Sequence, residues 1–328
     1  MLRSLLSIAL AALLLGLLMV WGGTDPAQVW ETLLRLDPAV FALAALLQGV
    51  VYPIRTLRFQ VLLPPQHRPT FTRLLPLSAA HILAANMLPA KVGEAAIVVY
   101  MNRLCDVPSS RGLAVLLLSR LLDLATVAAS LGIVCLGLGL GGAYPEVTWL
   151  APLGGLLFLA TLVFGGLALR PGIMVALPTW VSRALGLGRF KLGRRIESAL
   201  GHLTQAFAEV TPRRLFLGAF LSPPIWISSF FFYAILAREF GLTELTFTEA
   251  VFGSSLAVLA NLLPVNGFAG LGTQEAGWVL AFGVLGVARD VALETGVAAH
   301  LIYLFNLAVF GLLGHAFMGV ATKRTGSS

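Results

Sequence analysis

The chain has 328 residues, of which 58% are hydrophobic and only 11% are charged. This composition excludes an ordinary soluble domain, in which about 25% of residues are charged. The net charge is +7, but the basic residues gather in particular loops, which indicates orientation in a membrane and contact with anionic headgroups rather than nucleic-acid binding. We therefore predict an all-α polytopic membrane protein, with a single membrane domain over residues 1–328.

The apolar runs predict about six full transmembrane helices, because each approaches or exceeds the roughly 20 residues that cross a bilayer. The first run follows Arg3 and is longer than the core of a secretory signal peptide, so we expect an uncleaved helix. Two further segments, 74–89 and 246–264, are short, end at proline and are followed by a second short helical piece. We predict that both are re-entrant hairpins shielded by neighbouring helices. The six predicted spans are residues 2–21, 39–62, 112–140, 149–169, 215–237 and 297–320.

The two hairpins carry nearly the same sequence. Residues 85–95 read ANMLPAKVGEA, and residues 260–264 read ANLLP before a glycine-rich insert that leads to Glu275 and Ala276. A repeated polar element broken by proline in a membrane protein points to a transport site. We assign repeat one to about 39–169 and repeat two to about 215–320.

The basic loops predict the orientation of these repeats. With both termini in the cytoplasm, the chain obeys the positive-inside rule, and the two repeats enter their hairpins from opposite sides, which makes them inverted repeats. The connector 170–214 is then cytoplasmic, and apolar residues at helical spacing over 193–209 predict an amphipathic helix on that face. A linker that only carries orienting charge is the alternative. The predicted cytoplasmic side holds Arg68, Arg73, Arg103, Arg111, Arg170, Arg183, Arg189, Lys191, Arg194, Arg195, Arg213, Arg214, Lys323 and Arg324; the outer loops hold Arg35, Arg238 and Arg289.

Two glutamates end the two repeats and are the candidate proton-coupling residues. Glu94 and Glu275 are expected at membrane depth, where an ionisable side chain is costly and therefore suggests function. Asn86 and Asn261 precede the prolines and are candidates for binding substrate or bridging the broken backbone. The alternative for all four residues is that they hold the breaks together by hydrogen bonds.

Further candidates for substrate binding flank the breaks. Lys91 shares a helix face with Glu94, so it either meets an anionic phosphate or neutralises the glutamate. In the glycine-rich insert, Gly270 and Gly272 allow close approach of a phosphate, and Thr273 is placed to cap the following helix. The alternative is a turn without a ligand.

The predicted span 112–140 contains Arg120 and Asp123, which are one turn apart. Such a pair is either a buried structural ion pair or a ligand for the substrate, and His300 and Tyr303 stand at the corresponding place in repeat two. Arg55 and Arg58 share a face of span 39–62, where snorkelling to the cytoplasmic headgroups is expected; gathering anionic lipid is the alternative. No metal cluster, catalytic motif or cofactor site is recognisable.

Three motifs resemble the lysylphosphatidylglycerol synthase transmembrane-region family of flippase-like integral membrane proteins. They are NMLPAKVGE at 86–94, SRLLD at 119–123 and LPVNGFAGLGTQE at 263–275. The resemblance covers nearly the whole chain and implies movement of lipids or lipid-linked groups across the cytoplasmic (inner) membrane. Its motif positions match Lys91, Glu94, Arg120, Asp123 and Glu275. No soluble aminoacyl-transferase domain follows residue 320, so lipid lysylation by this chain is not expected.

The expected function is therefore translocation of a lipid or lipid-linked headgroup, with no cofactor. Membrane lipids with anionic or lipid-linked headgroups are the expected partners, and a homo-oligomer or a partner enzyme is possible. The first alternative is a membrane transferase or hydrolase that uses Glu94 or Asp123 as a base, although no nucleophile or metal set accompanies them. The second is a non-transporting partner subunit, which does not need two polar hairpins.

Overall fold

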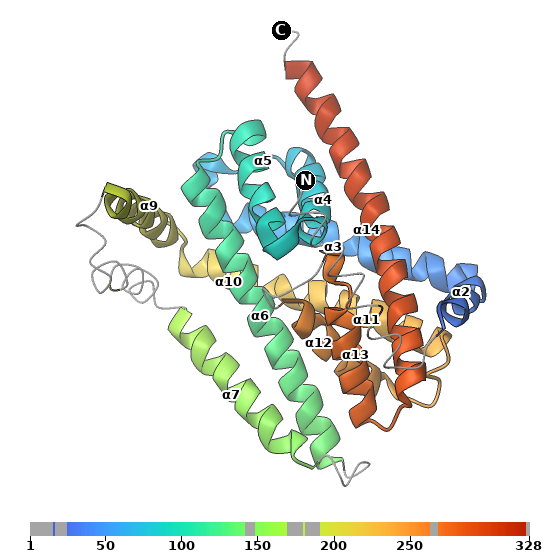
Figure 1. Ribbon diagram of the computed structural model, residues 1–328. Helices are drawn as coiled ribbons and strands as arrows, with labels where there is room; N and C mark the ends of the chain where they lie inside the picture. Colours follow the sequence, from blue (N-terminus) through green and yellow to red (C-terminus); the bar gives the residue numbers. More distant parts are fainter. Residues whose placement is uncertain are drawn as a thin grey trace.

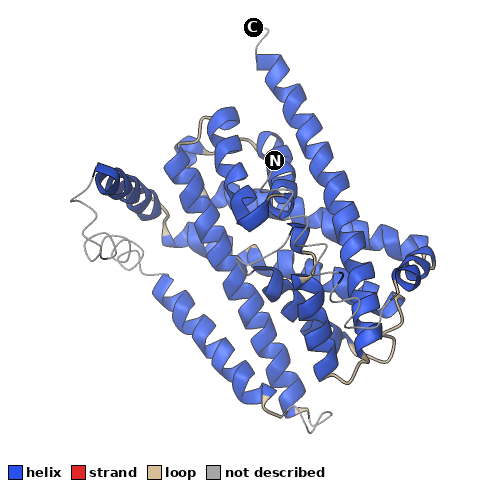
Figure 2. Cartoon of the chain, viewed as in Figure 1, coloured by secondary structure: helices blue, strands red, loops and turns tan. Residues whose placement is uncertain are grey.

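The computed structural model describes Gly16, Trp180 and residues 25–141, 148–168, 191–262 and 268–325, and every regular element among them is helical (Figures 1 and 2). The predicted all-α class is thereby confirmed for this part of the chain. The α-helices are α2 (Pro26–Leu34), α3 (Pro38–Leu62), α4 (Phe71–Met87), α5 (Ala96–Cys105), α6 (Ser109–Leu140), α7 (Leu150–Ala168), α9 (Lys191–Ala208), α10 (Pro212–Phe220), α11 (Ser222–Glu239), α12 (Phe247–Leu262), α13 (Thr273–Val284) and α14 (Arg289–Thr325). Short 3-10 helices are η1 (Pro65–His67), η2 (Pro89–Ala95) and η5 (Phe268–Gly270).

Among the described residues, four helical stretches are long and apolar enough to cross a membrane. They agree with four of the predicted spans, and the chain is a multi-pass membrane protein. A fifth prediction, 149–169, coincides with α7, of which the part Leu150–Thr161 is an apolar helix. The predicted span 2–21 lies outside the described residues apart from Gly16. The four stretches are Pro38–Leu62, Ser109–Leu140, Pro212–Glu239, which joins α10 and α11, and Arg289–Met318.

In both predicted hairpins the first helix ends before the proline of the motif. In the first, α4 ends at Met87 and Pro89 opens η2, because proline lacks the N–H that a continuing helix needs. In the second, α12 ends at Leu262, and η5 and α13 follow the glycine-rich insert, of which residues 263–267 lie outside the described part. We call residues 88–95 the first break and residues 263–272 the second break.

The two halves of the chain pack in matching pairs. The opening helices of the halves, α3 and α11, lie against each other. The long helix that follows each hairpin packs on the first hairpin helix of the other half: α6 lies against α12, and α14 lies against α4. Figure 1 shows the consequence, with α12 and α13 held between α6 and α14.

Small residues allow several of these helices to approach closely. A Cβ added at Gly132 of α6 would lie 2.9 Å from the Gly154 carbonyl oxygen of α7, and one at Gly314 of α14 would lie 2.7 Å from the Pro76 carbonyl oxygen of α4. Helices in a membrane associate through such close packing, since lipid tails are as apolar as the side chains they would replace.

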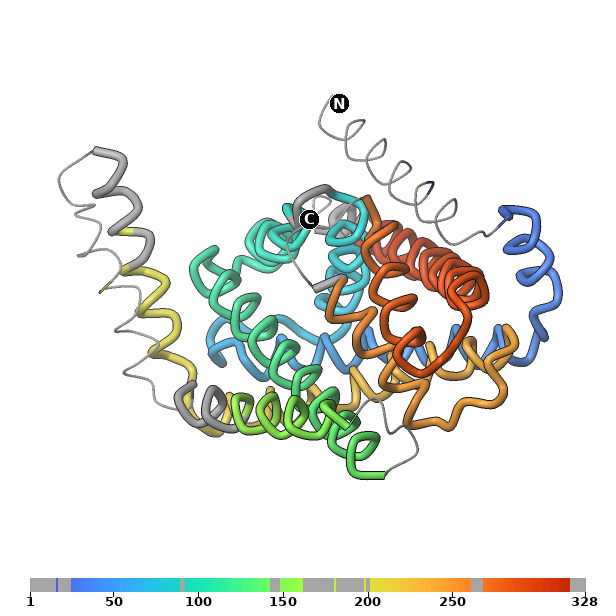
Figure 3. Tube along the Cα trace, turned by 60° about the horizontal axis from the view of Figure 1, so that its bottom comes forward, coloured from blue at the N-terminus to red at the C-terminus, as the bar shows by residue number. Residues whose placement is uncertain are grey.

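The predicted amphipathic helix of the connector is present as α9, which packs against α6. Figure 3 places α9 and α2 at opposite edges of the molecule. The cytoplasmic position of α9 stays a prediction, because the structure contains no membrane.

Candidate functional site

The first break brings a carboxylate close to the middle of the bundle. Gly93 packs directly on the preceding helix: a Cβ there would lie 1.9 Å from the Ala84 carbonyl oxygen. Only glycine fits this contact, since 1.9 Å is far below any van der Waals distance. The next residue, Glu94, therefore has a fixed position, and its side chain faces α6.

Glu94 pairs with Arg120 of α6. The guanidinium donates to Glu94 Oε2 from Nη2 at 2.5 Å and from Nε at 3.0 Å. His81 of α4 lies on the other side of the carboxylate, with its Nε2 3.7 Å from the same oxygen. Both side chains of the Glu94–Arg120 pair are partly exposed, at 21% and 28%, so the pair borders a cavity rather than a closed core.

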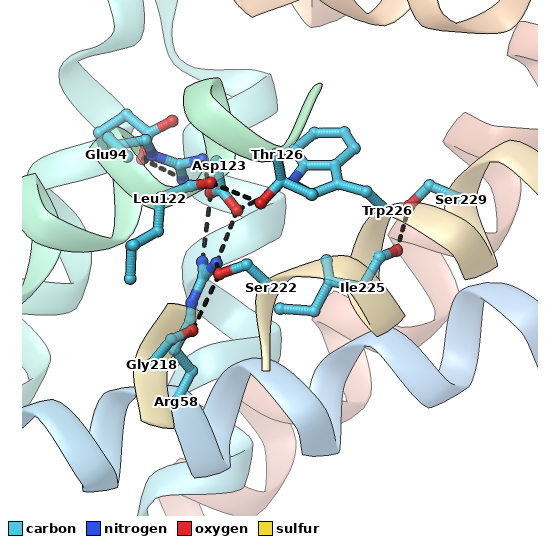
Figure 4. Close-up of polar contacts among 11 residues, drawn as sticks. Arg58, Glu94, Leu122, Asp123, Thr126, Gly218, Ser222, Ile225, Trp226 and Ser229 are labelled. Atoms are coloured by element: carbon cyan, nitrogen blue, oxygen red, sulfur yellow. Dashed lines mark hydrogen bonds and ion pairs between the residues drawn. The ribbon is translucent and has the colours of Figure 1, made fainter. Parts of the chain in front are cut away.

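Asp123 anchors the other end of this network and is fully buried. Its carboxylate accepts hydrogen bonds from Arg58 at 2.7 and 3.2 Å, from Arg120 at 3.1 Å and from the Trp226 indole at 3.0 Å. Ser222 also accepts from Arg58, at 2.9 Å. Figure 4 shows Arg58 and Trp226 converging on Asp123, with Glu94 nearby. A buried ion pair needs such additional hydrogen bonds to offset the cost of removing its charges from water.

A cavity with an empty volume of about 890 Å³, including its open side, lies next to this network. Helices from both halves of the chain line it. The lining residues are Gln48, Val51, Tyr52, Arg55, Ile82, Ala85, Asn86, Glu94, Arg120, Trp226, Ser229, Phe232, Tyr233, Val258, Gln274 and Tyr303.

Arg55 is the lining cation without a carboxylate partner among the described residues. Its Nε is buried without a hydrogen-bond acceptor, and its guanidinium carbon lies 6.0 Å from the centroid of the Trp226 ring. Such a distance is at the limit of a cation–π contact, which orients the guanidinium without neutralising it. The cavity wall therefore carries an available positive charge.

The second break is built differently. The backbone turns through positive φ at Ala269, Gly270 and Gly272, with φ values of 58°, 79° and 84°. Gly272 is the N-cap of α13, and its N–H donates to Glu275 Oε2 at 2.7 Å. The prediction that Thr273 caps this helix was wrong, because Thr273 is already its first residue and Glu275 supplies the capping oxygen.

Glu275 and His300 form a completely buried pair. His300 Nδ1 lies 2.5 Å from Glu275 Oε1, and His300 Nε2 lies 3.1 Å from the Ala269 carbonyl oxygen. A carbonyl oxygen only accepts hydrogen bonds, so Nε2 carries a proton. The short contact between Nδ1 and the carboxyl then holds a single proton, on either partner.

The structure gathers several of the predicted site residues and separates others. Arg120, Asp123 and Glu94 form one network, and Asn86 lines its cavity while donating to the Ile82 carbonyl oxygen at 2.8 Å within its own helix. Gly270 and Gly272 lie in the second break, and Thr273 and Glu275 lie in the first turn of α13 that follows it. The side chains of Lys91 and Asn261 lie outside the described residues.

The expectation that Arg58 snorkels to the headgroups was wrong. The Arg58 side chain is 1% exposed, because Asp123 and Ser222 satisfy it inside the bundle. Sequence reasoning also missed the cavity face of α3, where Tyr52 and Gln48 stand about one and two turns before Arg55. The signal was present: polar residues at i, i+4 and i+7 form one stripe along the helix.

Comparison with known proteins follows these observations. The family model described as "Lysylphosphatidylglycerol synthase TM region" matches residues 4–311. The protein named Glycosyltransferase AglD, from Haloferax volcanii, is 27% identical over 199 residues, which is 60% of this chain. The chain spans only about 30% of that relative's length.

Proposed function

Since the chain belongs to the lysylphosphatidylglycerol synthase TM-region family, we propose that it translocates a lipid or lipid-linked headgroup across the cytoplasmic membrane. The observation that carries the proposal is the cavity between the two halves of the chain, with Arg55 as an available cation beside the Glu94–Arg120 pair. An anionic headgroup would enter this cavity while the lipid tails stay in the bilayer.

The proposed architecture is a pair of inverted repeats with two re-entrant hairpins and about six full spans. The matched packing of α3 with α11, α6 with α12 and α14 with α4 supports it. Rocking of one half against the other would then expose the cavity to each side in turn. The proposed orientation puts both termini in the cytoplasm. Cysteine labelling of intact cells should reach a probe at position 144 and miss one at 189; labelling at 189 from outside would reject the orientation.

Proton coupling through Glu94 and Glu275 is the second part of the proposal. The single proton between Glu275 and His300, and the partly exposed Glu94 carboxylate beside the cavity, support it. A change in hydration of the two sites in opposite senses would load one glutamate with a proton and release one from the other.

A second candidate function is a membrane transferase acting on a lipid-linked substrate. The name of the relative, Glycosyltransferase AglD, favours it, as does a carboxylate beside the cavity. The matched part is a minority of that relative's length, so the transferase activity of the relative does not have to reside in the part that this chain shares.

Reconstitution of the purified protein into vesicles tests both candidates together. Fluorescent anionic and zwitterionic lipids are supplied in one leaflet, and the appearance of each lipid in the other leaflet is measured. The same vesicles are then analysed for altered lipid products. The translocase proposal expects movement of unmodified anionic lipid, slowed by Arg120→Gln or Lys91→Gln and unaffected by Arg35→Gln, which changes an exposed arginine. Lipid modification without movement would support the transferase instead.

A further inference from the structure

Three polar side chains form a line along the cavity face of α3. Gln48, Tyr52 and Arg55 occupy positions i, i+4 and i+7, which places the first and last about 10 Å apart along the helix axis. Each has a buried polar atom without a hydrogen-bond partner among the described residues: Gln48 Oε1, the Tyr52 hydroxyl and Arg55 Nε. Leaving such a group unpaired costs free energy, so a line of three points to a ligand that completes them.

The charges of the cavity select an anion at one end of this line. Among the described residues, the charged ones that line the cavity are two arginines and one glutamate, which leaves one positive charge in surplus. Arg120 is engaged by Glu94 and Asp123, so the surplus resides on Arg55. A guanidinium with available N–H groups binds a phosphate oxygen well.

The same cavity is unsuited to a headgroup that carries an amine. Glu94 is the lining carboxylate among the described residues, and it already accepts two hydrogen bonds from Arg120. An ammonium group in the cavity would meet Arg55 without a carboxylate available to neutralise it. Like charges brought together in a partly desolvated site weaken binding.

The other end of the line offers hydrogen bonds suited to hydroxyl groups. Gln48 Oε1 accepts, because the amide nitrogen of the same side chain already donates to the Tyr303 carbonyl oxygen at 3.2 Å. The Tyr52 hydroxyl donates or accepts. Trp226, Phe232 and Tyr233 also line the cavity, and aromatic rings of this kind can pack against the C–H groups of a polyol.

We propose that the cavity binds a phosphodiester whose uncharged headgroup carries hydroxyl groups, with the phosphate at Arg55 and the hydroxyls at Tyr52 and Gln48. This inference rests on the proposed function only in taking the phosphodiester from a lipid. It is narrower than that function, because it excludes aminated headgroups such as ethanolamine or a lysyl ester.

Binding, measured apart from transport, tests the inference. Purified protein in mixed micelles is heated with one added lipid at a time, and the rise in melting temperature gives an apparent affinity. The probes are phosphatidylglycerol, which has both features, phosphatidylmethanol, which has the charge without hydroxyls, and phosphatidylethanolamine and lysyl-phosphatidylglycerol, which have an amine. We expect phosphatidylglycerol to bind at least about tenfold more tightly than either aminated lipid, a difference of about 1.4 kcal/mol.

Two variants test the phosphate end and the hydroxyl end of the cavity separately. Arg55→Gln should weaken phosphatidylglycerol and phosphatidylmethanol alike, by about tenfold or more, because charge-assisted hydrogen bonds are lost. Tyr52→Phe removes a hydroxyl that has no hydrogen-bond partner among the described residues, so the fold should be unharmed. It should weaken phosphatidylglycerol by about fivefold and leave phosphatidylmethanol unchanged. Arg35→Gln is the matched control at an exposed arginine.

Equal binding of lysyl-phosphatidylglycerol and phosphatidylglycerol would overturn the proposal, as would unchanged binding by Arg55→Gln. Equal binding of phosphatidylmethanol would overturn its hydroxyl part. Free glycerophosphoglycerol and inorganic phosphate are the last two probes in the binding measurement. If the free phosphodiester binds and the lipid does not, the chemistry of the site stands and the lipid translocase fails. Tight binding of phosphate alone would overturn the phosphodiester assignment.

Discussion

The two breaks share a sequence motif but use their glutamates differently. At the first break, Glu94 is partly exposed to a cavity and belongs to a chain of charges that runs through Arg120 to Asp123 and Arg58. At the second, Glu275 is fully buried, caps its own helix and shares a proton with His300. Equivalent positions in a repeat can therefore have different surroundings: the glutamate at the first break borders a cavity as part of a charged network, and the glutamate after the second break is buried against a histidine.

The largest expected effect comes from removing the charge behind the first break. Asp123→Asn leaves Arg58 buried without a countercharge, and breaking a buried pair typically costs about 3–5 kcal/mol of stability. We expect a large fall in melting temperature in detergent, or little folded protein. Asp25→Asn is the matched control, because Asp25 is an exposed N-cap of α2 and asparagine caps equally well. Equal melting temperatures of Asp123→Asn and Asp25→Asn would show that the charged network does not stabilise the fold.

A smaller effect is expected from the close backbone contact of the first break. In Gly93→Ala, a Cβ would meet the Ala84 carbonyl oxygen, and overpacking of this kind typically costs about 1–3 kcal/mol. The control is Gly283→Ala in α13, where a Cβ meets nothing within 4 Å and alanine favours the helix by up to about 1 kcal/mol. Thermal unfolding of both variants should shift in opposite directions. A neutral Gly93→Ala variant would mean that the break relaxes easily.

Replacing each glutamate in turn with glutamine tests whether Glu94 and Glu275 have different roles. Glu275→Gln should lower stability by about 1 kcal/mol, because the amide keeps the cap but loses the shared proton. Glu94→Gln should lose less stability, since Arg120 is partly exposed and keeps Asp123. If both glutamates carry protons, each variant abolishes transport driven by a pH gradient and retains slower equilibration down a lipid gradient. Proton coupling is rejected if transport by the unmodified protein does not depend on pH. It is also rejected if both variants lose stability together with gradient-driven transport and passive equilibration.

Much of the fold was predictable because its causes are local. Apolar runs of sufficient length gave the long helices α3, α6 and α14, and the prolines at 89 and 264 marked where α4 and α12 had to stop. The repeated motif also drew attention to Glu94 and Arg120, which the structure joins.

The rest of the site depends on contacts between residues far apart in the sequence. Arg58 was misassigned to the membrane surface because its partner, Asp123, is 65 residues away, and Trp226, 103 residues from Asp123, carried no local sign of its role. Arg55 and Arg58 look alike on the same helix face. Only the three-dimensional arrangement distinguishes the arginine that is neutralised from the one that lines the cavity.

The smallest expected effect concerns the connector, which lies away from both breaks. Arg111 at the start of α6 holds Glu209, just after α9, through two hydrogen bonds of 2.7 and 2.8 Å. The hydrogen bonds from Arg111 lower the pKa of Glu209 below its ordinary value. A depressed carboxyl pKa means that the pair stabilises the docked connector above about pH 4.3, and that this contribution is lost as the pH falls through the lowered pKa.

Both side chains of this pair are about one quarter exposed, so solvent screening limits its contribution to roughly 0.2–1 kcal/mol. Arg111→Gln should therefore lower the melting temperature slightly at pH 7 and not at all below the lowered pKa. Protease cleavage in the connector should also become faster at pH 7. The exposed pair of Arg35 with Glu31, at 3.5 Å, gives the control, because Arg35→Gln should change neither measurement. If Arg111→Gln instead slows lipid movement as strongly as Arg120→Gln, docking of the connector is coupled to the cavity. The charged network at the first break would then not act independently of the rest of the bundle.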